Sequence, residues 1–330
     1  MDVIQVNNDG KSPYDLIKAE APRPDTPAGH VLIRVSHAGV NRPDILQRIG
    51  VYPPPMGASS ILGLEVSGYI ESLNLSDEEA RLLGWKLGDK VCALTNGGGY
   101  AEFVSVDARH LLPIPKGLTM AEAATLPEVS LTVYANMVEG GGLKAGETVL
   151  IHGGNSGIGS MAIQMAKGMG AKVITTVRGA DKAQAVAAFG ADLVIDATAG
   201  DFVEGVKAFG GADVVIDIVG GDYTDRNLIC LKPKGRLVQV GVGAGSKVTL
   251  DLFRIMQKQL ILTGSTLRPR SADEKARLSH AVRDQVWPLI DAGQIKTVVE
   301  KEFSLDKAGE AHAWLEAGQH VGKVVLKIGG

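Results

Sequence analysis

The sequence predicts an α/β protein of two domains, one of them a doubly wound parallel sheet of the kind that binds nucleotides. Its 330 residues exceed a typical single core of roughly 100–200 residues. Short apolar strands alternate with helical patterns from about residue 120 to residue 267. A glycine-rich turn at residues 151–159 follows a strand and opens a helix, which is the context that dinucleotide binding requires.

The first 120 residues or so predict a partly closed β-barrel. Strand character is found at residues 31–35, 68–71 and 90–94. Prolines recur throughout this part of the chain and exclude long helices there, because proline lacks the N–H that a helix interior needs.

The pattern changes near Met120 and again after Leu267. Between these points the predicted strands are 148–151, 172–177, 193–195, 213–218 and 236–240, separated by helical segments. This order indicates βαβ units around a parallel sheet. Beyond Leu267 we expect a long amphipathic helix from Ser271 to about Ala292, and a last strand at 323–327 that rejoins the first domain.

Composition and charge exclude several classes of partner and site. The net charge is −3, and no basic tract stands out, so neither a nucleic acid nor a membrane surface is an expected partner. Cys92 and Cys230, the two cysteines, are too few for a thiolate-rich zinc site or a disulfide scaffold. With no signal peptide and no apolar run of about 20 residues, we expect a cytoplasmic protein.

The turn reads Ile-His-Gly-Gly-Asn-Ser-Gly-Ile-Gly. Gly154 permits its tight bend, and Gly159 allows the helix to pack close to the strand. The helix N-terminus then offers free N–H groups to a pyrophosphate. Ser156 replaces the middle glycine of the usual pattern, and its hydroxyl could donate to a phosphate or ribose oxygen. The alternative is a turn with a purely structural role.

The residues after the second strand of this region bear on the choice of cofactor. In NAD-selective folds, that strand ends in an acidic residue that accepts a hydrogen bond from the ribose 2′-OH. Here Arg178 follows the strand, and Lys182 lies shortly after it. Both suit the 2′-phosphate of NADPH. The alternative is that they are solvated surface charges at a helix start.

Two polar residues of the first domain are candidates for contact with cofactor or substrate. Asn41 could touch a nicotinamide ribose or a substrate oxygen, or it could cap the helix that follows. Tyr52 lies on a proline-rich loop, where it could stack on a planar substrate, donate a proton or simply pack. No zinc-hydrolase motif or nucleophilic-serine motif is present.

Several ordered stretches together resemble the zinc-independent medium-chain dehydrogenase/reductases, in their quinone oxidoreductase (zeta-crystallin-like) branch. Zinc-using members carry a cysteine at the place of Asn41 and Gly-His-Glu at the place of Gly63-Leu64-Glu65. We therefore expect neither a catalytic nor a structural zinc ion. The resembling stretches are residues 38–44, 50–55, 62–68, 97–102, 151–159, 264–270 and 322–325.

The resemblance implies a domain layout. A GroES-like β-barrel domain would comprise residues 1–122 and 268–330, with a Rossmann NADPH-binding domain at 123–267 inserted between them. NADPH would bind in the cleft. Homodimers would form through the edge strands of the cofactor domains, at Leu260–Thr263.

The resemblance also implies site residues. Asn41, Tyr52 and Thr132 would lie near the nicotinamide. Two departures concern the 2′-phosphate: relatives have Gly-Ser where this chain has Arg178-Gly179, and a tyrosine near Ala197 is missing. The expected cofactor contacts are Gly154, Asn155, Ser156, Gly157, Ile158, Gly159, Arg178, Lys182, Gly241, Val242, Ser265, Thr266, Leu267 and Lys323.

The predicted reaction is direct hydride transfer from NADPH to a quinone or an activated enone without zinc. An electron-poor acceptor needs little Lewis-acid polarisation, so the protein would mainly orient the reactants and exclude water. Tyr52 or solvent would supply the proton. The alternatives are an enoyl- or acrylyl-thioester reductase and a non-catalytic NADPH-binding protein.

Overall fold

The computed structural model describes residues 1–329, which form two compact units. The barrel unit comprises Met1–Glu128, Arg268–Asp291 and residues 297–329, and the Rossmann unit comprises Val129–Leu267 and Ala292–Lys296. The predicted α/β class, a GroES-like barrel with a doubly wound parallel sheet, is confirmed. No helix among the described residues is long and apolar enough to span a membrane.

The barrel unit is built on a seven-stranded sheet in the order β14-β15-β3-β4-β5-β7, with β6 also paired to β3. Alternate strand residues face one apolar core that includes Val31, Ile33 and Val324. Its strands are β1 (Asp2–Val6), β2 (Leu16–Glu20), β3 (His30–Val40), β4 (Glu65–Asn74), β5 (Lys90–Leu94), β6 (Phe103–Asp107), β7 (Leu111–Pro113), β14 (Val299–Ser304) and β15 (Lys323–Lys327). Its helices are α1 (Arg42–Arg48), α2 (Asp77–Leu83), α3 (Met120–Ala123), α10 (Ala272–Gln285), α11 (Trp287–Asp291) and α12 (Ala308–Ala317), with short 3₁₀ turns at Pro13–Asp15, Ala108–His110 and Leu305–Lys307.

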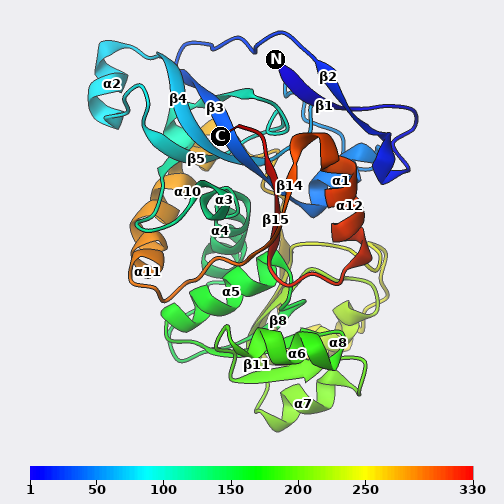
Figure 1. Cartoon of the computed structure of the whole chain (residues 1–330). Coiled ribbons are helices and arrows are strands. Elements are labelled where there is room, and N and C mark those ends of the chain that lie inside the picture. The colour runs from blue at the N-terminus through cyan, green and yellow to red at the C-terminus, as the bar shows by residue number, and fades with distance from the viewer. Residues whose placement is uncertain (330) are drawn as a thin grey trace. The chain divides into compact units, whose positions relative to one another are not determined.

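The last strand of the chain lies beside one of the first. β15 pairs antiparallel with β3, Val325 opposite Gly39, and the red β15 can be followed along the blue β3 in Figure 1. The expected return of residues 323–327 to the first domain is therefore confirmed. This pairing brings Lys323 to the carboxyl end of β3, next to Val40 and Asn41.

The Rossmann unit contains a six-stranded, all-parallel sheet in the order β10-β9-β8-β11-β12-β13. The strand order reverses between β8 and β11, and ligands of such sheets bind outside the carboxyl ends of the strands at this point. Its strands are β8 (Thr148–His152), β9 (Lys172–Val177), β10 (Leu193–Asp196), β11 (Ala212–Asp217), β12 (Leu231–Gln239) and β13 (Ile261–Gly264). Its helices are the π-helix η3 (Tyr134–Gly140), α5 (Gly157–Gly168), α6 (Ala180–Ala187), α7 (Phe202–Ala208), α8 (Tyr223–Cys230) and α9 (Leu252–Lys258); α4 (Pro127–Val133) contains the division between the units.

The division between the units differs from the expected boundary at residues 122/123. It falls at Glu128/Val129, because α3 packs on β3 and β4 of the barrel and Ser67 Oγ donates to the Met120 carbonyl at 2.6 Å. Residues 292–296 group with the Rossmann unit, since Gln164 exchanges two hydrogen bonds with the backbone of Lys296.

The expected helix from Ser271 to about Ala292 is two helices. α10 ends at Gln285 and α11 begins at Trp287. Pro288 explains the interruption, because it has no N–H to continue the hydrogen-bond ladder of α10. The break allows Trp287 and Ile290 to be buried, and the Trp287 indole donates to the Pro113 carbonyl at 2.8 Å.

Candidate active site

The glycine turn between β8 and α5 leaves no room for side chains at two positions. A Cβ on Gly154 would lie 2.4 Å from Thr175 Oγ1, and one on Gly159 would lie 2.2 Å from the Gly153 carbonyl oxygen. Gly153 itself has φ +73°, which other residues rarely adopt. The turn is therefore a close-packed backbone cradle that only glycines can form.

Ser156 holds this cradle together from inside. Its Oγ accepts from the Gly159 N–H at 3.0 Å and donates to the Gly153 carbonyl at 2.8 Å. The hydroxyl proton is thus already used within the turn. Gly157 and Ile158 are the first residues of the twelve-residue α5, where N–H groups lack intrahelical acceptors. Together with the helix dipole, these N–H groups fit a pyrophosphate.

A buried polar network braces the neighbouring strand ends. His152 Nε2 donates to Asn227 Oδ1 at 2.7 Å, and Asn227 Nδ2 donates to Asp217 Oδ2 at 3.0 Å. Asp217 in turn accepts from the N–H groups of Val219 and Gly220 and so shapes the loop after β11. This network keeps the carboxyl ends of β8 and β11 rigid at the place where a nucleotide is expected.

Other expected cofactor residues surround the same sheet edge. Gly241 follows β12, its N–H donates to the Asp217 carbonyl at 3.2 Å, and Val242 is 50% exposed. Thr266 is exposed, whereas Leu267 is buried. Asn155 lies in the glycine turn before Ser156.

Thr132 contributes a buried hydroxyl that has no partner. Its Oγ1 is solvent-inaccessible and makes no hydrogen bond within the described chain. Its carbonyl accepts from Asn136 Nδ2 at 2.9 Å, and Asn136 Oδ1 accepts from Ser265 Oγ at 2.9 Å. Asn136 belongs to the π-helix η3, a form of helix found frequently at functional sites. A buried hydroxyl without a partner is available to a ligand.

The ends of β9 and β10 carry charges of both signs. Arg178 is exposed directly after β9, and Lys182 is partly buried in the first turn of α6. Asp196 ends β10, where its Oδ1 accepts from the Gly179 N–H at 2.9 Å and from Thr198. In NAD-selective folds the acidic residue ends the second strand, which is β9 here. Asp196 instead ends the next strand, β10, and its carboxylate already accepts from backbone N–H groups.

In the barrel unit, Asn41, Glu65 and Lys323 form one buried cluster. Lys323 Nζ donates to both Asn41 Oδ1 and Glu65 Oε1, the latter at 2.6 Å, and Asn41 Nδ2 donates to Glu65 Oε1 at 2.9 Å. The side chain of Glu65 is completely inaccessible to solvent. Gly39 makes space for it, because a Cβ there would lie 2.1 Å from Glu65 Oε1. The Asn41 amide is therefore locked in one orientation.

Asp44 fixes the backbone around Asn41. Its carboxylate accepts from the Asn41 N–H at 2.9 Å and from the Gly63 N–H at 3.0 Å. Burial raises the pKa of Asp44 to about 6, so the group is mainly ionised at neutral pH. Asn41 does begin α1 as its N-cap residue, but its side chain pairs with Glu65 and Lys323.

A series of hydrogen-bonded side chains connects α12 to Asp44. Arg48 binds Glu316 through two nitrogens, at 2.9 and 3.3 Å, and its Nη1 lies 3.3 Å from His312 Nδ1. A guanidinium can only donate, so His312 accepts through Nδ1 and carries its proton on Nε2. His312 Nε2 therefore donates a hydrogen bond to the Tyr100 hydroxyl oxygen at 3.1 Å, and the Tyr100 hydroxyl donates to the Asp44 carboxylate. Each hydrogen bond between Arg48 and Asp44 along this path therefore has a defined donor and a defined acceptor.

The neutral form of His312 predicts a pH-dependent stability. Burial, and then the charge of Arg48, lowers the pKa of His312 from 6.5 to about 3. The unfolded chain takes up this proton below about pH 6.5 while the folded chain does not, so stability is lost as the pH falls through that window. His312→Gln, which can still accept and donate, should reduce the loss in unfolding free energy from about pH 7.5 to about pH 5 by about 2 kcal/mol.

Urea denaturation of both proteins at the two pH values measures this difference. Equal pH dependence in His312→Gln and the parent would contradict a neutral, buried His312.

Tyr52 lies on the loop after α1, where the Arg268 guanidinium carbon is 5.7 Å from its ring centroid. Burial, and then the charge of Glu128, raises the pKa of Tyr52. Glu128 lies in the first turn of α4, and its N–H donates to Glu65 Oε2 at 2.9 Å. Loss of hydration, and then the Glu65 charge, raises the pKa of the Glu128 carboxyl to about 8. A largely protonated acid therefore lies beside the Asn41 cluster.

The structure groups the sequence-predicted residues within each unit. Asn41 and Lys323 form one cluster in the barrel unit, with Tyr52 on the loop that follows α1. Sequence reasoning missed Asp44, Glu65 and the chain from Glu316 to Tyr100, because their partners are up to 268 residues away along the chain. Among residues 1–329, no three His, Cys, Asp or Glu side chains are grouped to hold a metal ion.

Comparison with known proteins adds independent evidence. Residues 27–116 match the family model described as alcohol dehydrogenase GroES-like domain, and residues 157–283 match that described as zinc-binding dehydrogenase. The chain is 32% identical to a quinone oxidoreductase of Pseudomonas aeruginosa over 90% of each protein. It is 31% identical to acryloyl-coenzyme A reductase of Sulfurisphaera tokodaii over 93% of this chain and 95% of that protein.

The chain also resembles a segment of much larger proteins. It is 29% identical to a phenolphthiocerol/phthiocerol polyketide synthase of Mycobacterium tuberculosis over 98% of its own residues, but spans only 15% of the length of that synthase.

Solved structures agree with the sequence relatives. Escherichia coli quinone oxidoreductase complexed with NADPH has a TM-score of 0.86 and 28% identity, with 99% of this chain and 100% of that chain covered. For the quinone oxidoreductase of Thermus thermophilus, described also in its complex with NADPH, the TM-score is 0.84 and the identity 29%, at 99% and 100% coverage. With two matching domain models and full-length relatives, this chain belongs to the medium-chain dehydrogenase/reductase superfamily, in its quinone oxidoreductase branch.

Proposed function

We propose that this protein is an NADPH-dependent reductase that delivers hydride to a quinone or an activated enone without zinc. The glycine turn, the N-terminus of α5 and the unpartnered Thr132 hydroxyl suit a bound dinucleotide. When bound, NADPH supplies the hydride. The residues of the barrel unit would orient the acceptor and hold its surroundings in one arrangement.

The observation that carries the zinc-free part of the proposal is the position of the Lys323 ammonium. It donates to both Asn41 and Glu65, two residues of the stretches where zinc-using relatives differ from this chain. Oxygen atoms of both side chains thus already accept hydrogen bonds from a cation that belongs to the protein. Leu64 adds an apolar, buried side chain where those relatives have histidine.

A thioester reductase is the second candidate. The similarity to an acryloyl-coenzyme A reductase extends over nearly the whole chain and is about as high as that to a quinone oxidoreductase. An enoyl thioester and a quinone are both electron-poor acceptors of hydride. The two candidates differ in the acceptor and share the cofactor.

The deciding experiment measures NADPH oxidation with 1,4-benzoquinone, 9,10-phenanthrenequinone and crotonyl-coenzyme A. We expect turnover with at least one quinone and little with the thioester. Turnover with crotonyl-coenzyme A alone would assign the protein to the thioester reductases. Tight NADPH binding without turnover of any of the three would indicate a non-catalytic NADPH-binding protein.

Arg178 is proposed to bind the 2′-phosphate of NADPH. Arg178→Ala should raise the KM for NADPH by about tenfold and leave the KM for NADH nearly unchanged, since an exposed charge-assisted contact contributes about 1.5 kcal/mol. Lys172→Ala, which removes an exposed cation at the opposite end of β9, is the control. Equal increases for both cofactors would show that Arg178 is a surface charge only.

We further propose that the protein forms a homodimer through β13. This strand is the edge of the Rossmann sheet, and Ile261 and Leu262 on it are 55% and 37% exposed. An apolar, unpaired edge is a template for pairing with a second copy. Ile261→Lys should convert the dimer into a monomer in analytical ultracentrifugation, whereas a monomeric parent protein would contradict the proposal.

Two buried, free thiols, Cys92 and Cys230, agree with the proposed cytoplasmic location.

A further inference from the structure

Arg268 carries a buried nitrogen that the protein leaves without a partner. The residue is 6% exposed, and its Nε and Nη2 both donate to the Asn96 carbonyl, at 3.2 and 2.7 Å. Nη1 makes no hydrogen bond within residues 1–329. A charged donor that is buried without a hydrogen-bond partner destabilises the folded protein strongly. Such a group needs an explanation, and a missing ligand is the simplest one.

A second buried cation lies beside Arg268. Lys275 is 2% exposed, and its Nζ donates to Asn96 Oδ1 and to the Arg268 carbonyl, each at 2.6 Å. An ammonium has three N–H groups, so one donor of Lys275 remains. Burial lowers the pKa of Lys275 to about 8 and also lowers that of Arg268.

Neither cation has a carboxylate within ion-pair distance in the described chain. The acidic groups that act on them from further away are Glu128 on both, Asp44 on Arg268 and Glu274 on Lys275. Of these, Glu128 is largely protonated at neutral pH. Two buried cations therefore share a place that lacks a counter-anion, although buried charges are normally paired.

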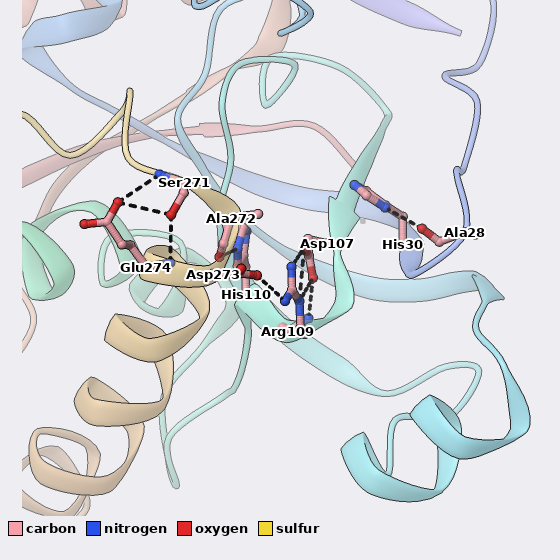
Figure 2. Close-up of polar contacts among 9 residues, drawn as sticks. All are labelled: Ala28, His30, Asp107, Arg109, His110, Ser271, Ala272, Asp273 and Glu274. Carbon is pink, nitrogen blue, oxygen red and sulfur yellow. Dashed lines mark hydrogen bonds and ion pairs between the residues drawn. The ribbon is translucent and has the colours of Figure 1, made fainter.

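The surrounding structure holds these groups rigidly. Figure 2 shows how α10, which carries Lys275, is fastened to the strands: Arg109 joins Asp107 to Asp273, and His110 Nε2 donates to the Ala272 carbonyl at 2.8 Å. Ser271 and Glu274 cap the same helix reciprocally. A cavity of about 490 Å³ within the barrel unit reaches Lys275 and Asn96. The cations are thus preorganised, and the cavity reaches Lys275 and also Asn96, the residue that accepts from both cations.

We propose that Arg268, supported by Lys275, binds the single oxygen atom of a planar acceptor that becomes negative when hydride arrives. Nη1 is the guanidinium nitrogen without a partner, and its N–H groups can donate to an oxygen that becomes negative. The guanidinium lies over the Tyr52 ring, so an aromatic side chain is part of the same surroundings. Preorganised cations aimed at developing negative charge lower the reaction barrier.

The inference rests on the proposed function and gives its acceptor a chemical class. Hydride from NADPH converts a quinone into a quinol monoanion and leaves NADP⁺; one proton from solvent then completes the quinol. Arg268 would hold the oxygen that carries the negative charge between these two steps.

The test uses 4-nitrophenol, whose visible absorption separates phenol from phenolate, and needs no turnover. Full-length protein with NADP⁺ should lower the pKa of the bound phenol by about one unit, because a cation within about 4–6 Å favours the charged form. Arg268→Met should abolish this shift, and Arg268→Lys, which keeps the charge, should retain part of it. Arg277→Met changes an exposed arginine on α10, the helix that carries Lys275; this variant is the control and should behave as the parent protein.

The outcomes separate this proposal from the proposed function. An absent shift in the parent protein, or an unchanged shift in a folded Arg268→Met, would overturn the anion site whatever the quinone activity. Equal affinity for 4-nitrobenzoate, or displacement of the phenolate by an equal concentration of sulfate, would overturn the assignment to a single aryl oxygen. A shift without any quinone turnover would support the site and contradict the proposed function.

Discussion

Replacing Glu65 by leucine is expected to lower the free energy of unfolding by about 3–5 kcal/mol, because it leaves a buried ammonium without its partner. Lys323 Nζ lies 2.6 Å from Glu65 Oε1, and neither side chain reaches solvent to any useful extent. The double variant Glu65→Leu/Lys323→Met should recover most of this loss, since well-packed apolar residues often replace a buried ion pair at little cost.

The same two variants separate stability from activity. The single variant removes one of the two partners that hold the Asn41 amide, and the double variant removes both. Both variants should therefore lose activity, by about 100-fold if the amide moves by about 1 Å. Thermal or urea denaturation and quinone-dependent NADPH oxidation measure the two effects. Glu71→Leu on the same strand is the control: its ion pairs with Arg23 and Arg34 are exposed, and such pairs contribute about 0–1 kcal/mol. A loss of less than about 3 kcal/mol in the free energy of unfolding of Glu65→Leu would contradict a buried charge pair.

Gly159→Ala is expected to weaken NADPH binding by about ten- to a hundredfold. Its Cβ would lie 2.2 Å from the Gly153 carbonyl and 2.7 Å from Gly154 Cα, so the backbone of the turn must move. Overpacking of this kind typically costs about 1–3 kcal/mol, and each 1.4 kcal/mol lost from binding is a factor of about ten.

The measurement is the dissociation constant of NADPH from the quenching of protein fluorescence. Gly200→Ala in the same unit adds the same methyl group where no atom lies within 4 Å, and it should bind NADPH normally. Unaltered binding in Gly159→Ala, with the thermal stability also unaltered, would show that this turn is not the cofactor site.

The fold is predictable where its signals are local. Each βαβ unit shows its strand, turn and helix within about thirty residues, and the glycine turn is read directly from the chain. The exception is α10, where the amphipathic pattern predicts a helix to about Ala292 and the structure ends it at Gln285. A single proline, Pro288, outweighs a well-formed amphipathic pattern.

The barrel site is predictable only in part, because its contacts join distant residues. The position of Asn41 in a turn makes it a candidate, but no residue near it in the sequence predicts that Lys323, 282 residues later, binds its side chain. Glu65 belongs to a resembling stretch that gives it no role. The two cations at Arg268 and Lys275 look like ordinary surface charges in the sequence, and only their burial identifies them.

The pairing of β15 with β3 also orders the assembly of the protein during synthesis. Nearly all of the Rossmann unit is one continuous stretch, so it can fold as soon as residues 129–296 have left the ribosome. The barrel is completed later, since residues 37–40 of β3 lack their pairing with β15 until residues 324–327 appear. His312, Glu316 and Lys323 arrive in the same final segment. The polar residues around Asn41 are therefore completed last, by the closing strand of the chain.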